Sequence, residues 1–328
     1  MKAKITIFSL GLLCCVIFLF NSATTKSLFS EIAVICVKSI APSVFPFIVS
    51  SNILLAAVRS APIKVKTVLI YVLGLFFGFP ISVSFAAKMY ARNEIGLNTY
   101  KKLVCCGGIP SISFTIGMCG NRFGYEKAAY LYFITLASAL LCSSFFPDDI
   151  RTNKIITSQQ QDDASVLSEL SVSIKDGILR TVIVCGYVSF FYVLSGIICR
   201  NLKNGYAVTL ICGFLEFSTG CARGFLLNDV DSYILCAGVL SFSGISVFMQ
   251  SITIEKENNA TVIKTEYLVS RLVQGILSCV MAYTVYAYGF PSLILFFAVT
   301  VASTCCSGVL QTINKNQLKN KPKHSIIN

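Results

Sequence analysis

One acidic side chain lies in the middle of an apolar run, where a charge is most costly. Glu216 lies inside the run Tyr206–Leu226. A carboxylate at that depth costs about 2.5–3.5 kcal/mol on insertion scales, so such residues are usually functional or paired. We interpret Glu216 as a group that couples transport to a proton or cation, or that hydrogen-bonds a solute. The structural alternative is a salt bridge to Lys38 or Arg223.

A second charge, Lys38, lies within the apolar run Ile32–Val58, about one turn before the first of two prolines. Prolines free backbone carbonyl groups, and hydroxyl and amide side chains follow close by. These prolines and polar residues are Pro42, Pro46, Ser43 and Asn52. A lysine and several half-helix N-termini that face one cavity favour an anionic solute. The alternative is that Lys38 extends to the outer membrane interface.

Further polar residues lie beside glycines and prolines that interrupt the apolar runs. Besides Pro42 and Pro46, the expected helix breaks are Gly78, Pro80, Gly108, Pro110, Gly213 and Gly244. The polar side chains that complete the expected solute site are Ser82, Ser111, Ser113, Ser218, Thr219, Ser243 and Gln250. Hydrogen bonds between helices explain many of these groups without any ligand.

Several kinds of chemistry are excluded by what the chain lacks. Its single histidine, His324, lies in a basic tail, so a histidine-dependent triad or a histidine-rich metal site cannot form. The 15 cysteines include no CxxC pair and lie mostly in apolar runs, which is typical of packing residues. Neither a nucleotide-binding loop nor a nucleophile–base pair is visible. We therefore expect no enzymatic activity, no cofactor and no metal.

The composition indicates a membrane protein. Of the 328 residues, 55% are hydrophobic and only 13% are charged, with a mean hydropathy of +0.74. A soluble chain carries roughly 25% charged residues. The net charge of +12 is distributed in short clusters between apolar runs, which is the pattern of topology signals rather than of a nucleic-acid interface. We expect a polytopic helical protein that binds membrane lipid and no nucleic acid.

The positions of the basic residues favour a particular topology. The ten apolar runs are Ile5–Phe20, Ile32–Val58, Thr67–Ala87, Leu103–Gly120, Ala128–Phe146, Thr181–Cys199, Tyr206–Leu226, Tyr233–Ile254, Tyr267–Gly289 and Ser292–Thr312. If the third and seventh runs dip into the membrane and return, most basic residues lie on the cytoplasmic side, as the positive-inside tendency requires. Both termini are then cytoplasmic. The first run could alternatively be a signal peptide.

This topology predicts an inverted repeat. Each half consists of a spanning helix, a broken re-entrant segment, a broken crossing helix and a second spanning helix, and the halves enter from opposite sides. Paired interrupted segments of this kind indicate a binding site near the membrane midplane. We expect residues 1–31 to be a transmembrane helix or signal anchor, 32–146 the first repeat, 147–180 a polar cytoplasmic linker, 181–289 the second repeat, and 290–328 the last transmembrane helix with a basic tail.

Five motifs resemble, in order, those of the YlbJ-like sporulation integral membrane proteins, relatives of the nucleoside-recognition (Gate) domain family. They are Pro42-Ser43-Val44-Phe45-Pro46-Phe47, Gly78-Phe79-Pro80 with Ala87-Lys88, Gly213-Phe214-Leu215-Glu216, Ser243-Gly244-Ile245-Ser246-Val247 with Gln250, and Ser270-Arg271-Leu272-Val273-Gln274-Gly275. The resemblance covers roughly residues 32–288. It implies a cell or forespore membrane of a spore-forming bacterium, a transport-like role in spore maturation, and dipicolinic acid as one possible cargo.

Two functions from different classes follow. The leading hypothesis is a secondary transporter or facilitator of a small solute, anionic or nucleoside-like, that acts during spore maturation. The alternative is a non-transporting membrane scaffold for spore assembly, a degenerate Gate domain. The expected partners are the solute, lipid, and either further copies of the chain or other sporulation membrane proteins.

Overall fold

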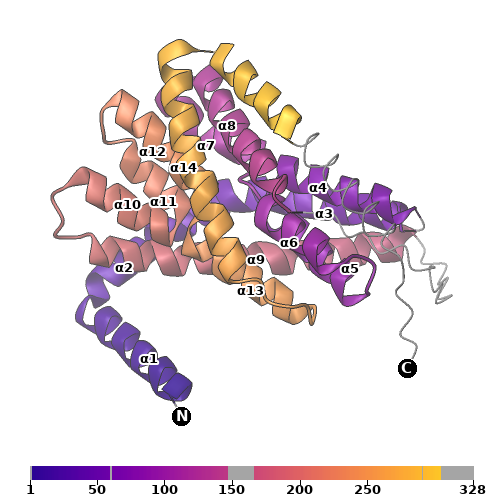
Figure 1. Cartoon of the computed structure of the whole chain (residues 1–328). Helices are drawn as coiled ribbons and strands as arrows, with labels where there is room; N and C mark the ends of the chain where they lie inside the picture. The colour runs from indigo at the N-terminus through magenta and orange to yellow at the C-terminus, as the bar shows by residue number, and fades with distance from the viewer. Residues whose placement is uncertain (1, 60, 147–165, 290, 304–328) are drawn as a thin grey trace, which may run out of the picture.

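The computed structural model describes residues 2–59, 61–146, 166–289 and 291–303, and its regular secondary structure in these ranges is helical (Figure 1). Four helical segments are long and apolar enough to cross a membrane: Ser22–Ala57, Val166–Ile198, Asp229–Glu257 and Thr265–Tyr288. The expected all-α class is confirmed, and these four segments indicate an integral membrane protein.

Each half of the chain contains long helices and pairs of shorter helices, in a similar order. The N-terminal half contains α1 (Lys2–Phe20), α2 (Ser22–Ile35), the π-helical turn η1 (Cys36–Ile40), α3 (Ala41–Ala57), α4 (Ile63–Phe77), α5 (Ile81–Ala91), α6 (Leu97–Cys106), α7 (Ile112–Phe123) and α8 (Tyr125–Ser143). The C-terminal half contains α9 (Val166–Ile198), α10 (Gly205–Leu215), α11 (Phe217–Gly224), α12 (Asp229–Phe242), α13 (Gly244–Glu257) and α14 (Thr265–Tyr288). A shorter apolar helix, Pro291–Ser303, follows α14.

The prolines at 42 and 46 do not break their helix, contrary to expectation. The helical segment runs without interruption from Ser22 to Ala57, and both prolines lie within it. Proline has no N–H with which to continue the usual hydrogen-bond ladder. The π-helical turn just before Pro42 accommodates this, because the Ala41 N–H donates to the carbonyl of Cys36, five residues earlier.

Two expected domain boundaries fall inside helices. The boundary after residue 31 lies within the segment Ser22–Ala57, so no helix ends there. Residues 166–180 of the expected linker form the first turns of α9. Ser173, Gly177 and Arg180 are buried at helical spacing, so this stretch presents a packed stripe that its polar composition concealed. Residues 147–165 of the linker and residues 304–328 lie outside the described part of the chain.

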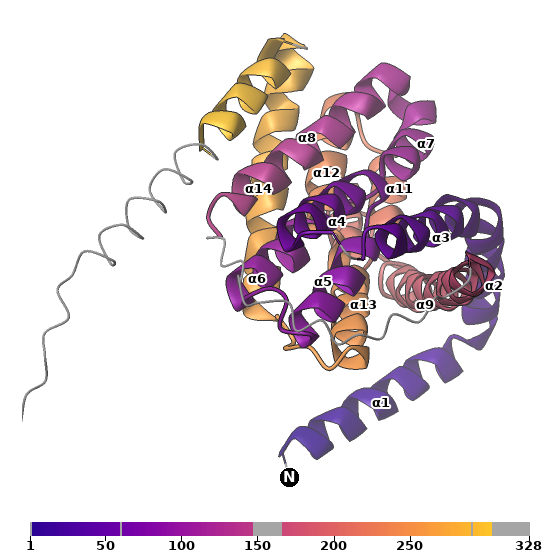
Figure 2. The same cartoon turned by 90° about the vertical axis from the view of Figure 1, so that its right-hand side faces the viewer.

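The α2–α3 segment and α9 run side by side in opposite directions. Arg200 hydrogen-bonds to Thr24 at one end, and Asn52 hydrogen-bonds to Asp176 towards the other. Both segments lie crosswise to α14. Figure 2 shows α9 nearly end-on, whereas α14 runs up the picture. At 36 residues, Ser22–Ala57 is about 54 Å long. A helix of that length must tilt strongly or project from a bilayer core of about 30 Å.

The two halves share a single packed body. Helix α14, from the second half, packs against α12 but also against α8 and α6 of the first half. Buried residues of α7 and α8 lie in one hydrophobic cluster with residues of α11, α12 and α14, such as Leu131, Leu240 and Met281. Helix α1 instead projects from this body with exposed apolar side chains, Phe8 and Leu19 among them (Figures 1 and 2).

Candidate functional site

In the first half, the two chain breaks lie against each other. Helix α4 ends at Phe77 and α5 begins at Ile81, while α6 ends at Cys106 and α7 begins at Ile112. The Phe79 N–H donates to the carbonyl of Ile109 at 3.2 Å, which joins the two breaks. Gly78 has φ +82°, and a Cβ there would lie 2.8 Å from the backbone nitrogen of Ser111. Only glycine permits both the backbone angle and this close approach.

The second half has an equivalent arrangement. Helices α10 and α11 are separated at Glu216, and α12 and α13 at Ser243. Gly213, which we expected at the break, lies instead within the last turn of α10. Gly244 has φ +79°, and a Cβ there would lie 3.2 Å from the backbone of Glu216. The two breaks of this half therefore also touch each other.

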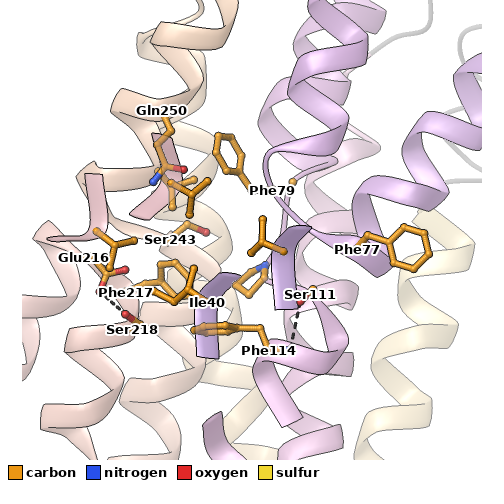
Figure 3. A pocket seen from close by; sticks show the side chains of 16 residues that line it. Ile40, Phe77, Phe79, Ser111, Phe114, Glu216, Phe217, Ser218, Ser243 and Gln250 are labelled. Carbon is orange, nitrogen blue, oxygen red and sulfur yellow. Dashed lines mark hydrogen bonds between the residues drawn. The ribbon is translucent and has the colours of Figure 1, made fainter. Parts of the chain in front are cut away.

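A small cavity lies where the breaks of the two halves meet (Figure 3). Its polar and break residues are Gly108, Pro110, Ser111, Glu216, Ser218, Ser243 and Gln250. Its apolar wall consists of Ile40, Val44, Phe77, Phe79, Phe114, Val184, Val188, Phe217 and Val247. The cavity measures about 60 Å³, enough for a few water molecules. Ligand pockets are typically about 300–1,000 Å³, so this space is smaller than an ordinary ligand site.

The two carboxylate oxygens of Glu216 have different surroundings. Oε2 accepts hydrogen bonds from the backbone N–H of Thr219 at 2.8 Å, from the Thr219 hydroxyl at 2.9 Å, and from the Ser218 hydroxyl. Glu216 is thus the N-cap of α11, where the helix dipole favours a negative charge. Oε1 has no hydrogen-bond partner, although Glu216 is fully buried. No ion pair joins Glu216 to Lys38 or Arg223, so the structural alternative is not what positions this carboxylate.

The other polar side chains at the cavity come from both halves. Ser111 caps α7 by accepting a hydrogen bond from the Phe114 N–H. Ser243 donates to the carbonyl of Leu240 in its own helix. Gln250 donates through Nε2 to Ser246, and its Oε1 has no partner although the residue is buried. The cavity therefore has two buried oxygen atoms, from Glu216 and Gln250, that no donor satisfies.

Three of the predicted solute-binding residues lie elsewhere. Lys38 is exposed on the outside of η1 and does not line the cavity. The hydroxyl of Ser43 donates to the carbonyl of Ile40 in its own helix, and Asn52 joins α3 to Asp176 of α9. The position of Lys38 therefore gives no support at this cavity to the anion preference that we derived from it, and that preference stays a prediction.

Three further predicted residues serve to position the breaks. Ser82 is buried and donates to the carbonyl of Leu103, which holds α5 against α6. Thr219 binds Glu216 but does not line the cavity. Ser113 is exposed, and its hydroxyl lies 3.3 Å from that of Ser111. Gly78 and Pro80 likewise shape the α4–α5 break without lining the cavity.

Two buried polar residues of α14, Arg271 and Gln274, had no predicted role. Arg271 is fully buried, and its Nη2 donates to the carbonyl of Gly108 at 2.5 Å. Gln274 donates to the carbonyl of Cys105 at 3.0 Å. Both side chains thus bind the C-terminal end of α6, where a cation interacts favourably with the helix dipole. The sequence feature that could have pointed to this role is an arginine inside the apolar run Tyr267–Gly289.

Glu255 is a second fully buried carboxylate, and it lies outside the cavity. It accepts hydrogen bonds from the Tyr100 hydroxyl and from the Ile263 N–H, and so joins the α13–α14 connection to α6. It does not line the cavity. Within the described residues, no three His, Cys, Asp or Glu side chains come together in a way that could hold a metal ion.

No protein-family model, curated protein or solved structure matches this chain. The resemblance to the YlbJ-like and Gate families therefore stays a prediction from the five motifs. The geometry of the breaks and of the cavity carries the functional argument.

Proposed function

We propose that the chain is an integral membrane transporter or facilitator that moves a small solute past the cavity at Glu216. The observation that carries the proposal is the meeting of four helix breaks at a buried cavity with unsatisfied carboxylate and amide oxygens. Irregular backbone at membrane depth is tolerated only where it is buried in protein or lines a cavity. On the resemblance of its motifs, we place the transporter in the cell or forespore membrane of a spore-forming bacterium, with a role in spore maturation.

An inverted repeat supports this proposal. The two halves have the same order of helices: one long helix, two pairs of helices separated by a break, and a second long helix. The first half runs from η1–α3 to α8, and the second from α9 to α14. The equivalent helices α3 and α9 run antiparallel, as Asn52–Asp176 and Arg59–Glu169 at one end and Thr24–Arg200 at the other require. Antiparallel equivalents are what two halves inserted in opposite directions produce.

The second pair of long helices follows the same rule. At one end of α8, Lys127 lies over the ring of Tyr286, near the end of α14. At the other end, Cys142 of α8 lies in one hydrophobic cluster with Tyr267, near the start of α14. Antiparallel packing of α8 against α14 is what an inverted repeat predicts.

The alternative function, a non-transporting scaffold for spore assembly, is favoured by one observation. A cavity of about 60 Å³ is too small for a nucleoside or a dicarboxylate in this conformation. A transporter must therefore open the contact between the two pairs of breaks, whereas a scaffold needs no opening. Measured solute movement separates the two functions.

Transport can be tested with the purified full chain in liposomes. Uptake of a labelled nucleoside and of labelled dipicolinate is compared between wild type, Glu216→Gln and Glu255→Gln. We expect wild type to admit at least one solute faster than empty liposomes, and Glu216→Gln to lose this uptake. Glu255→Gln is the matched control, because it neutralises an equally buried carboxylate outside the cavity, and it should keep the uptake.

Uptake no faster than in empty liposomes, from wild-type protein that is folded and inserted, would support the scaffold instead. Equal uptake by wild type and Glu216→Gln would leave a transporter whose solute path does not involve the cavity carboxylate.

A further inference from the structure

The charge of Glu216 is only partly compensated by the protein. Its Oε2 is satisfied by three donors from the first turn of α11, while Oε1, equally buried, is bonded to nothing. An ionised group in an apolar environment is unfavourable unless its remaining lone pairs are paired. The cavity is therefore built to hold a negative charge that still needs a partner.

The other polar groups at the cavity all offer acceptor lone pairs, and Ser111 and Gln250 carry donor hydrogens as well. Gln250 presents an unpartnered Oε1, and it is only 2% exposed. The hydroxyl protons of Ser218 and Ser243 are already donated, to Glu216 and to the carbonyl of Leu240, so that their lone pairs remain. Among the residues that the structure describes, no lysine or arginine lines the cavity. Arg271 donates to the carbonyl of Gly108 and to Gln274, has one unpartnered donor in Nε, and does not line the cavity.

The size of the cavity restricts what can supply the missing positive charge. A space of about 60 Å³ accommodates an ion with one or two water molecules, but no organic solute of ordinary size. Calcium and magnesium sites usually combine carboxylates with several further oxygen ligands, and a single carboxylate balances a single positive charge. Hard oxygen ligands, one charge and small volume together describe a site for a small monovalent cation.

We propose that the cavity binds a small monovalent cation between Oε1 of Glu216 and Oε1 of Gln250. The hydroxyl oxygens of Ser218 and Ser243 complete the oxygen ligands, and Figure 3 shows these side chains around one space. The ion links α11 to α12–α13, the two broken elements of the second half. The site deepens the proposed transport function by naming its coupling ion, yet cation binding is measurable without any transport.

The test uses the purified full chain in detergent at pH 8. The melting temperature is recorded while choline chloride is replaced by sodium, potassium or ammonium chloride at constant ionic strength. Choline, a quaternary ammonium ion too large for the cavity, serves as the probe of ionic strength alone. We expect at least one small cation to raise the melting temperature saturably, because it binds the folded state only.

Two variants assign the effect to the cavity. Glu216→Gln should weaken the apparent cation affinity roughly thirtyfold or more, since it removes the only charge that faces the ion. Glu255→Gln, the matched control, should retain the wild-type affinity. If Glu216→Gln does not fold, Gln250→Met removes the second ligand at similar volume and should weaken binding in the same direction.

Equal melting temperatures in choline and in every small cation would overturn the proposal. So would a cation effect that is unchanged in both Glu216→Gln and Gln250→Met. The outcome is separable from that of the proposed function: cation-dependent stability without solute uptake contradicts the transporter, whereas uptake that is indifferent to the cation contradicts only the coupling site.

Discussion

Adding one methyl group at Gly220 should destabilise the protein, because the two helices of the α10–α11 pair touch at that residue. A Cβ at Gly220 would lie 2.3 Å from Cα and 2.6 Å from the nitrogen of Gly213. Carbon atoms in contact normally lie about 3.5–4.0 Å apart, so the backbones would have to separate by more than about 1 Å. Both atoms belong to backbone, and no side-chain rotation can relieve the clash.

The expected magnitude follows from two opposing terms. Overpacking of a tight contact costs about 1–3 kcal/mol. Alanine in place of glycine within a helix contributes up to about 1 kcal/mol in the favourable direction. Gly220→Ala should therefore lower the free energy of unfolding by about 1–2 kcal/mol.

The assay is thermal unfolding of the full chain in one detergent, with Gly117→Ala as the matched control. Gly117 lies in α7 with nothing within 4 Å of its would-be Cβ, so this variant should equal or exceed wild-type stability. The same melting temperature for both variants would refute the packing of α10 against α11 described above.

Four further outcomes are expected. Glu216→Leu should have a free energy of unfolding about 1 kcal/mol lower than that of Glu216→Gln, because only the glutamine amide can still cap α11. Equal melting temperatures for the two variants would contradict the capping role. Lys38→Met should leave solute-dependent and cation-dependent stabilisation unchanged, since the exposed lysine lies outside the cavity; weaker stabilisation would place it in the site after all. Arg271→Lys should lower stability by about 1.5–3 kcal/mol, as a lysine cannot reproduce the buried bond to the α6–α7 break, and an unchanged melting curve would refute that role. Single cysteines placed at Arg92 and Tyr125, both exposed, should react with an impermeant maleimide from opposite sides of the membrane; labelling from one side would contradict the inverted topology.

The positions of most helix breaks could be predicted because their causes are local. Gly78 with Pro80 and Gly108 with Pro110 lie between helices, as does Ser243 just before Gly244. A missing N–H or a backbone angle that only glycine adopts readily acts within a few residues. Pro42, Pro46 and Gly213 are the exceptions: the helix continues through both prolines, with a π-helical turn just before Pro42, and Gly213 lies inside α10.

The roles of the charged residues could be predicted only in part. Glu216 was recognisable as costly from its apolar neighbours, but its division into one capping oxygen and one free oxygen depends on the fold of α11. The positions of Lys38 and Arg271 could not be predicted from their neighbours. Lys38 was expected at the cavity and is exposed, whereas Arg271 had no predicted role and is fully buried.

The sequence by itself determined that the chain is helical, that it is apolar enough to span a membrane, and where most of its helices are interrupted. These properties arise from composition and from neighbouring residues, which a linear reading contains. Only the tertiary structure decided which polar side chains share the cavity, because Ser111 and Gln250 come from segments far apart in the chain. Their meeting depends on how α4–α7 pack against α10–α13, and the direction in which each side chain points is set by that packing.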